Sequence, residues 1–314
     1  MEIIWLNGSE KPHNLACTVA LGNFDGVHLG HQRLLARVVA FAQELGARPA
    51  VCTFYPHPLK YHKRAEPAGL KDVQLICSQE EKYGLLARYG IAACFVAAFD
   101  ADFAALSPEE FVQIYIVEKM QAKAVVVGSD YNFGRDRVGT ATVLKELCEA
   151  RGIRCEVIER LNVDNEPVSS SRIRRMILAG DYDKLPMLLG RFMEYTGIVG
   201  HGEQLGTKIG YPTANMQLDN EILPPDGVYA GYTTIYGRKY PIMAYMGTRP
   251  TVSSSQRRGF EVNIIGYEAA KPLYGSILAI TIIAKIRDGK KFASVDELKA
   301  QLAKDQQTAI RMNV

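Results

Sequence analysis

Two histidines and three glycines lie close together early in the chain, in Gly22-Asn23-Phe24-Asp25-Gly26-Val27-His28-Leu29-Gly30-His31. An apolar run at 16–21 precedes them and apolar residues at helical spacing follow as far as Leu45, so we expect a strand, a turn and a helix. A helix N-terminus favours anions, and glycine lets a phosphate approach the backbone. His28 and His31 fall on one side of a helical turn. The pattern predicts a nucleoside triphosphate site; the alternative is a glycine-rich turn with two solvated histidines.

A second candidate phosphate site is Ser169-Ser170-Ser171-Arg172-Ile173-Arg174, which opens a predicted helix. The hydroxyl groups and backbone N–H groups of Ser170 and Ser171 can hold phosphate, and Arg174 offers a fork of donors. The alternative is an ordinary serine-rich helix cap. Combined with the two histidines, this segment predicts attack on an α-phosphorus with pyrophosphate leaving. A phosphate nucleophile is already ionised, so we expect cations at His28, His31 and Arg174, with Mg²⁺, and no general base.

A third group of residues lies in the second half of the chain. Thr213 and Asn215 stand two positions apart in the loop Gly206-Thr207-Lys208-Ile209-Gly210-Tyr211-Pro212-Thr213-Ala214-Asn215, and their oxygen atoms suit Mg²⁺ bound with nucleotide phosphates. Glu261 shares a strand face with Asn263 and could deprotonate an alcohol for attack on a γ-phosphate. The alternatives are an ordinary proline turn and a solvated strand glutamate.

The elements of the first half alternate between strands and helices. Apolar runs occur at 16–21, 49–54, 91–99, 122–127 and 153–158. Ser78 with Glu81 and Ser107 with Glu110 have the spacing of capping boxes at helix starts. This alternation predicts a doubly wound parallel sheet with helices on both faces, in which ligands bind beyond the carboxyl ends of the strands. The candidate segments that follow strands and meet there are 22–31, 54–58, 128–134 and 169–174.

The second half has the pattern of a small antiparallel β-barrel. Runs near 193–199, 226–236, 239–247, 259–267 and 276–287 alternate with turn signals. Ser294 and Glu297 predict the cap of a closing helix that ends near Leu302. We therefore expect two domains, 1–188 and 189–314.

Composition narrows the class of protein. A net charge of +3 over 314 residues gives no general reason to expect nucleic acid as a partner, so anion sites must be local. The apolar runs are too short for a membrane helix, and no secretory signal is visible. The six cysteines form no Cys-x-x-Cys pair and are expected to be reduced core thiols of a cytoplasmic protein, although a disulfide between distant positions stays open.

Taken together, these motifs resemble the bacterial bifunctional riboflavin kinase/FAD synthetase family along nearly the whole chain. The resemblance is carried by residues 22–31, Phe54-Tyr55-Pro56-His57-Pro58, the loop from Gly128 to Gly134, residues 169–174, Gly210-Tyr211-Pro212-Thr213-Ala214-Asn215, Gly227-Val228-Tyr229-Ala230, Gly247-Thr248-Arg249-Pro250-Thr251 and Leu273-Tyr274-Gly275. It implies that the first domain transfers AMP from ATP to FMN, and that the second phosphorylates riboflavin with ATP. Both steps are expected to use Mg²⁺.

The resemblance also implies roles for single residues. His28, His31 and Arg174 would be catalytic in the first site and Glu261 would be the base of the second. Thr213 and Asn215 would hold the metal, and His57 and Asp130 would bind flavin. ATP would be held by Gly22, Asn23, Phe24, Gly30, Ser170, Ser171 and Lys208.

Four positions depart from the usual family pattern. Ser171 replaces threonine, Thr207 stands where a basic residue is common, Asn132 replaces arginine, and Gly266-Tyr267 replaces an Asp-Phe pair. These departures leave two rival hypotheses open: an enzyme in which only one domain is active, and a flavin-sensing binding protein. Partners are expected to be riboflavin, FMN, FAD and ATP, with no nucleic acid and no membrane; the oligomeric state is open.

Overall fold

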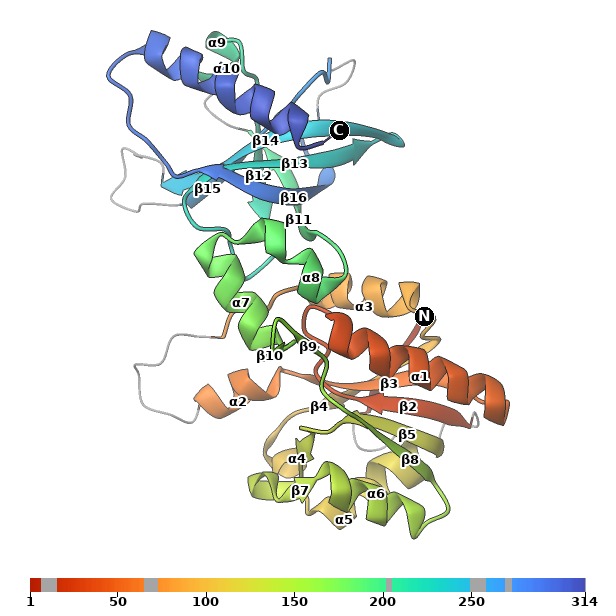
Figure 1. The fold of residues 1–314 in the computed structure, drawn as a ribbon. Helices are drawn as coiled ribbons and strands as arrows, with labels where there is room; N and C mark the ends of the chain where they lie inside the picture. Colours follow the sequence, from red (N-terminus) through yellow and green to blue (C-terminus); the bar gives the residue numbers. More distant parts are fainter. Residues whose placement is uncertain (7–15, 65–72, 202–204, 249–257, 269–272, 314) are drawn as a thin grey trace. The chain divides into compact units, whose positions relative to one another are not determined.

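The computed structural model describes residues 1–6, 16–64, 73–201, 205–248, 258–268 and 273–313. Their contacts divide them into two compact units, Met1–Ser169 and Ser170–Val314. Each unit has its own sheet, drawn in Figure 1. None of the helices in the described ranges combines the length and apolar character that a membrane span requires.

The first unit is built on a six-stranded parallel sheet in the order β1-β4-β3-β2-β5-β8. The strands are β1 (Glu2–Leu6), β2 (Cys17–Leu21), β3 (Arg48–Tyr55), β4 (Ala93–Ala98), β5 (Ala122–Gly128) and β8 (Arg154–Ile158). Five of them confirm the predicted runs. The sixth, β1, pairs with β4 at the sheet edge and has only two buried residues, Ile4 and Leu6, so it lacks a continuous apolar run.

Helices cover both faces of this sheet, as the doubly wound prediction requires. They are α1 (Leu29–Leu45), α2 (Pro58–Arg64), α3 (Gln79–Arg88), α4 (Ala101–Ala105), α5 (Pro108–Phe111), the π-helix η1 (Val112–Lys119) and α6 (Ala141–Glu149). Successive β2 residues belong to different apolar clusters: Val19 packs with Phe111 and Leu144, and Ala20 with Leu35 and Leu86. In Figure 1, α1 and α3 lie on one side of the sheet and α4 to α6 on the other. Both predicted capping boxes are present.

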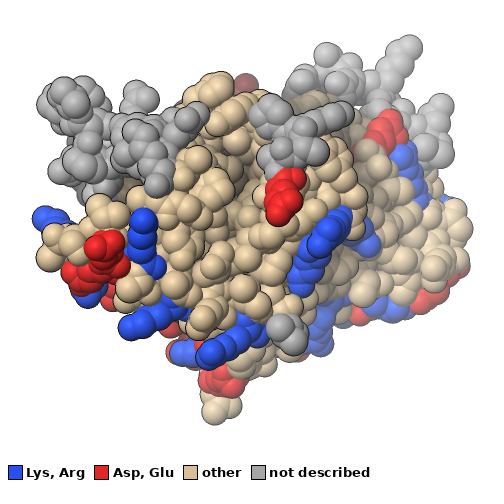
Figure 2. All heavy atoms as spheres, turned by 90° about the horizontal axis from the view of Figure 1, so that it is seen from above, with Lys and Arg blue, Asp and Glu red and all other residues tan. Residues whose placement is uncertain are grey.

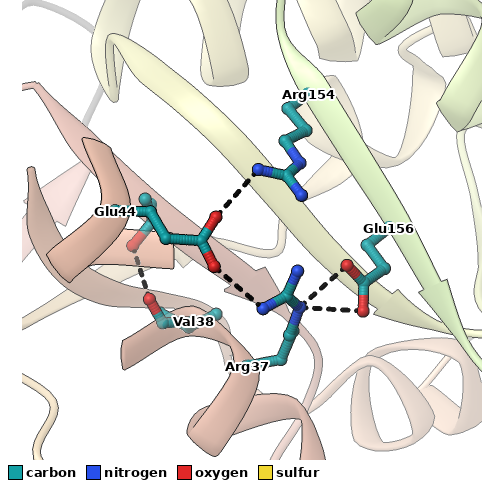
Figure 3. A network of polar contacts seen from close by, with 6 residues as sticks. Arg37, Val38, Glu44, Arg154 and Glu156 are labelled. Carbon is teal, nitrogen blue, oxygen red and sulfur yellow. Dashed lines mark hydrogen bonds and ion pairs between the residues drawn. The ribbon is translucent and has the colours of Figure 1, made fainter. Parts of the chain in front are cut away.

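Charged side chains fasten α1 to the edge strand β8. Arg37 donates to Glu156 and Glu44, and Arg154 donates to Glu44 (Figure 3). The guanidinium carbon atoms of Arg37 and Arg154 lie 3.9 and 4.2 Å from the centre of the buried Phe41 ring. These contacts fix the direction of α1, the helix that follows His28.

The short elements that complete the first unit form two small hairpins. They are β6 (Asn132–Phe133) with β7 (Gly139–Thr140), the 3-10 turn η2 (Arg135–Arg137), and β9 (Asn162–Val163) with β10 (Glu166–Pro167). All six cysteines are free and buried, which confirms the expectation of reduced core thiols. Their burial raises the pKa of the Cys17, Cys77 and Cys94 thiols to about 12.

The second unit is a closed antiparallel barrel in the order β11-β12-β15-β14-β13-β16. Its strands are β11 (Met193–Gly200), β12 (Ala214–Leu218), β13 (Gly227–Ile235), β14 (Arg238–Thr248), β15 (Arg258–Ile264) and β16 (Ile277–Arg287). The helical elements are α7 (Ser170–Ala179), η3 (Tyr182–Lys184), α8 (Pro186–Leu189), α9 (Leu205–Lys208) and α10 (Val295–Arg311). The barrel prediction is confirmed. The runs did not include β12, in which only Met216 is buried.

The closing helix α10 begins at the predicted cap but continues to Arg311, so the predicted end near Leu302 is wrong. Its later turns stay helical because they are fastened to the barrel. The Arg287 guanidinium pairs with the buried Asp305 at 2.8 Å, and Ala309 packs against Val228 and Ala230.

The predicted division at 188/189 differs from the division by contacts. Residues 170–188 group with the barrel. The buried Tyr182 of η3 contributes to this grouping, because its hydroxyl group lies 2.6 Å from that of Tyr195 on β11. The boundary between the two functional domains stays a prediction.

Candidate active sites

The segment between β2 and α1 forms a tightly held loop at the carboxyl end of the sheet. Phe24 and Val27 are fully buried and have positive φ angles of 52° and 39°. The buried Asp25 carboxylate accepts hydrogen bonds from the backbone N–H groups of Ile76 (2.9 Å) and Cys77 (3.4 Å). These bonds fix the loop to the chain segment that leads into α3.

His28 is the N-cap of α1. Its Nδ1 atom accepts a 3.3 Å hydrogen bond from the backbone N–H of His31. This bond assigns the proton of the neutral His28 ring to Nε2. A Cβ on Gly30 would lie 3.2 Å from the same ring, so glycine gives the imidazole its room.

The rings of His28 and His31 are stacked, with centroids 3.6 Å apart and planes 14° apart. Burial lowers the pKa of His31 well below its usual value, and the charges of His28 and Lys82 lower it further. His31 is therefore neutral near pH 7. The expected roles of His28 and His31 as cations beside bound phosphates stay predictions.

Two polar side-chain atoms of residues 22–31, Asn23 Oδ1 and His31 Nδ1, are buried and have no hydrogen-bond partner among the residues that the structure describes. Such atoms are rare in proteins and cost free energy while they lack a partner. His31 lies in the first turn of α1, where backbone N–H groups have no acceptor within the helix. The loop therefore offers both unsatisfied polar atoms and the positive end of a helix to a ligand.

Two further predicted segments follow strands that end at the same edge of the sheet. His57 follows β3, is buried, and accepts a hydrogen bond of 3.2 Å at Nδ1 from the backbone N–H of Leu59, so it caps α2. Asp130 follows β5, is exposed, and pairs with Arg160 at 2.7 Å. Because β3, β2 and β5 are neighbours in the sheet, the structure brings these segments to the first loop. Their flavin-binding roles stay predictions.

The fourth predicted segment is divided between the units. Val168, in the first unit, has its carbonyl oxygen 3.9 Å from where a Cβ on Gly30 would lie. Ser170, Ser171 and Arg174 belong to α7, which groups with the second unit. The chain approaching them passes beside the histidine loop, while their own place in the site stays a prediction.

In the barrel, Thr213, Asn215 and Glu261 come together. Asn215 on β12 lies directly opposite Glu261 on β15, so both side chains stand on the same face. Thr213 Oγ1 donates a hydrogen bond of 3.4 Å to Glu261 Oε2. The loop before Thr213 folds back on itself: Tyr211 N–H donates to the Gly206 carbonyl at 2.8 Å. A Cβ on Gly206 would clash with the Tyr211 carbonyl, so this closeness requires glycine.

Tyr245 extends the row of cross-strand partners formed by Asn215 and Glu261, and we did not predict it from the sequence. On β14 it is the partner of Glu261 on the side away from Asn215. Its ring lies along its own strand over Gly247, where any Cβ would clash with it. Burial raises the pKa of Tyr245, and the charges of Asp226 and Glu261 raise it further. The signal in the sequence was the spacing Tyr-x-Gly on a predicted strand.

Asn263, two positions after Glu261, supports the loop from behind. It is buried, and its Nδ2 donates to the Pro212 carbonyl at 2.8 Å. Its Oδ1 is buried and has no partner in the part of the chain that the structure describes. Lys208 ends α9, but its side chain is not among those described, and Arg249 to Thr251 lie outside the described residues.

Charge on the surface is mixed. On the face drawn in Figure 2, lysine and arginine side chains occur beside aspartate and glutamate side chains, with wide uncharged areas between them. No group of three or more His, Cys, Asp or Glu side chains within the described ranges could hold a metal ion. Oxygen atoms of Thr213, Asn215 and Glu261 do fit Mg²⁺, which prefers few protein ligands together with substrate phosphates.

Comparison with known proteins finds a matching family for each half of the chain. Residues 10–172 match the FAD synthetase family and residues 189–313 match the riboflavin kinase family. The chain belongs to the bifunctional riboflavin kinase/FMN adenylyltransferase family. Relatives with that name from Bacillus subtilis and Escherichia coli are 35% and 34% identical, each over 96% of this chain and 94% of the relative. The Pseudomonas fluorescens relative is 34% identical over 94% of this chain and 92% of its own.

These matches confirm the predicted resemblance to this family. A solved structure confirms the fold. A crystal structure described as a macrolide-efflux protein from Streptococcus pneumoniae has a TM-score of 0.88 and 33% identity, covering 98% of this chain and 99% of that one. That description concerns the pneumococcal protein.

Within this family, the departures have local structural explanations at two positions. Gly266 has a φ of 74° in the turn after β15, where aspartate would be strained, and the following Tyr267 packs edge-on against Tyr240. Asn132 lies on β6 and donates to the Asp130 carbonyl at 2.8 Å. Thr207 is exposed in α9, and nothing in the structure explains it.

Proposed function

We propose that the two domains make FAD in succession: the barrel phosphorylates riboflavin to FMN, and the parallel-sheet domain joins FMN to the adenylyl group of ATP. The observation that carries the barrel assignment is the meeting of Thr213, Asn215 and Glu261 on one face. A carboxylate beside two neutral oxygen ligands can take the proton of an alcohol while a metal-bound nucleotide is held next to it.

In the barrel site, Glu261 removes the proton of the riboflavin 5′-hydroxyl as its oxygen attacks the γ-phosphorus of ATP. The bond between that phosphorus and the β–γ bridging oxygen breaks, and ADP leaves. Thr213 and Asn215 would hold Mg²⁺, which neutralises phosphate charge when it is bound. Tyr245, on the far side of Glu261, limits the space in which the alcohol can lie.

In the first site, a phosphate oxygen of FMN attacks the α-phosphorus of ATP and pyrophosphate leaves. No proton has to be removed, so positioning and charge neutralisation suffice. The N-terminus of α1 and the imidazole N–H of His28 donate to the phosphates, and Asn23 and His31 gain the partners they lack. Ser170, Ser171 and Arg174 would complete the site, and His57 and Asp130 would contact the flavin.

The test is analysis of products. Riboflavin, ATP and Mg²⁺ are incubated with the protein, and the flavins are separated by chromatography; a second reaction begins from FMN. FAD in both reactions supports the proposal. FMN alone from riboflavin means that the first domain is silent, and unchanged riboflavin contradicts the kinase assignment. Tight flavin binding without any product supports the rival flavin-sensing protein.

The two sites can be separated by variants. Asn215→Ala should abolish FMN formation and leave FAD formation from supplied FMN nearly intact, because Asn215 lies only in the barrel row. Removal of divalent metal with a chelator should stop both steps, and added Mg²⁺ should restore both. Loss of FAD formation from FMN in Asn215→Ala would mean that the two sites are coupled.

A further inference from the structure

Lys82 is a buried lysine that no role proposed above uses. It lies in the middle of α3 and is 7% exposed, on the same helix face as the fully buried Leu86 four positions later. Its Nζ atom donates to Thr53 Oγ1 at 3.3 Å, and this is its hydrogen bond within the described part of the chain. No carboxylate of the described residues lies within ion-pair distance of it.

This arrangement is costly. An ammonium group has three donors, and burial without an ionic partner costs several kcal/mol unless other groups compensate. Asp25 attracts the Lys82 charge, while its Oδ1 atom accepts hydrogen bonds from the backbone N–H groups of Ile76 and Cys77. Burial outweighs that attraction, and the pKa of Lys82 is lowered. The folded protein keeps a positive charge that its own residues do not neutralise well.

The position of this charge links it to the phosphate loop. Thr53 Oγ1, which accepts from Lys82, itself donates to the Asn23 carbonyl at 3.2 Å. Lys82 is therefore linked through Thr53 to Asn23, whose side-chain oxygen is buried with no partner among the described residues. Its charge also lowers the pKa of His31. A positive charge in a buried position acts more strongly on a nearby anion than a solvated one does.

We propose that the positive charge of Lys82 makes the first site select nucleotides by their phosphate charge. ATP is then preferred to ADP and AMP. Lys82 acts through the low-dielectric loop as a positioning residue, without touching the substrate. The proposal rests on the adenylyltransferase function given above. Thr53 fixes the ammonium group in place, and the phosphates supply the negative charge that the folded chain lacks.

The test is hydrogen–deuterium exchange of the peptide that carries residues 22–31, titrated with AMP, ADP and ATP. This readout is local, so nucleotide bound to the barrel does not enter it. Lys82→Met should weaken ATP about tenfold or more, ADP less, and AMP by less than about threefold, since the lost attraction grows with phosphate charge. Lys82→Arg should keep the ATP preference.

Two controls separate charge from structure. Thr53→Val removes the hydrogen bond but keeps the ammonium group, so ATP should still be preferred to AMP. Lys82→Met should leave the first unit as stable as before or more stable, because an apolar side chain of similar size replaces a poorly neutralised buried charge. A merely structural lysine would instead show destabilisation and equal weakening of all three nucleotides.

The proposal is overturned if Lys82→Met binds the three nucleotides in the same ratio as the unchanged protein, or if none of them protects the peptide in either protein. Failure of the proposed function looks different. In that case the unchanged protein shows the preference for ATP at residues 22–31 but makes no FAD from FMN.

Discussion

The imidazole rings of His28 and His31 lie face to face, 3.6 Å between centroids, and the backbone N–H of one residue is held by the ring of the other. Burial lowers the pKa of His31, and the charge of the neighbouring His28 ring lowers it further. This relationship has a consequence for the response of His31 to pH.

Acid should reveal the neutral state of His31. The pKa of His31 is lowered in the folded protein, so below about pH 6.5 the unfolded chain binds more protons than the folded chain. The free energy of unfolding therefore decreases as the pH is lowered, by up to about 1.4 kcal/mol per pH unit. The ring-proton NMR signal of His31, assigned by its loss in His31→Gln, should not shift until well below pH 6.5. A midpoint near 6.5 would contradict this assignment.

His31→Ala should impair FAD formation and leave FMN formation nearly intact. The variant removes the stacked ring and the buried Nδ1 atom, while the backbone N–H that His28 accepts remains. Chromatography of flavins made from FMN and from riboflavin measures each step. Equal loss of both activities would mean that the variant damaged the fold.

Glu261→Gln should abolish riboflavin phosphorylation. The amide keeps the size of the carboxylate and a hydrogen-bond partner for Thr213, but it cannot take a proton, so a loss of about 10² to 10⁴-fold in kcat is expected. FAD formation from supplied FMN serves as the matched control in the same protein. A loss below about tenfold would show that Glu261 is not the base.

Gly247→Ala should also reduce phosphorylation, through Tyr245. The added Cβ clashes with the Tyr245 ring and forces it to swing from its place beside Glu261. Tyr245→Phe keeps the ring and should be much milder. In the double variant Gly247→Ala/Tyr245→Ala the clash is gone, so the two substitutions should not add. Additive losses would place the cause elsewhere in the strand.

Asp305→Ala should destabilise the barrel by about 3 kcal/mol, because it leaves the Arg287 guanidinium without its buried carboxylate partner. Asp296→Ala, on an exposed position of the same helix, should cost less than about 1 kcal/mol. Urea unfolding followed by far-UV circular dichroism measures both. Similar midpoints for the two variants would contradict the role of Asp305.

Much of this architecture was predictable because buried strands leave continuous apolar runs. The runs at 16–21 and 122–127 became the neighbouring strands β2 and β5, and the spacing of His28 and His31 predicted that they would meet. The elements that were missed, β1 and β12, have few buried residues, and each pairs with a strand far away in the sequence, β1 with β4 and β12 with β15.

The electrostatic state of the site was not predictable in the same way. Burial lowers the pKa of His31 most, followed by the charges of His28 and Lys82, and only folding brings Lys82, fifty-one positions later, close enough to act on that ring. The sequence held one signal for it: Lys82 precedes the buried Leu86 by one helical turn. Tyr245 was likewise hidden, since its position beside Glu261 depends on the register of β14 and β15.

The residues of the barrel site lie far apart along the chain. Thr213 and Glu261 are separated by 48 positions and meet only when β12 and β15 pair. Contacts distant in sequence form late because a long loop must be closed first. The kinase centre therefore exists only after the barrel has closed. After dilution from denaturant, the rate at which FMN synthesis returns would measure the rate of barrel closure, so that catalysis reports on folding.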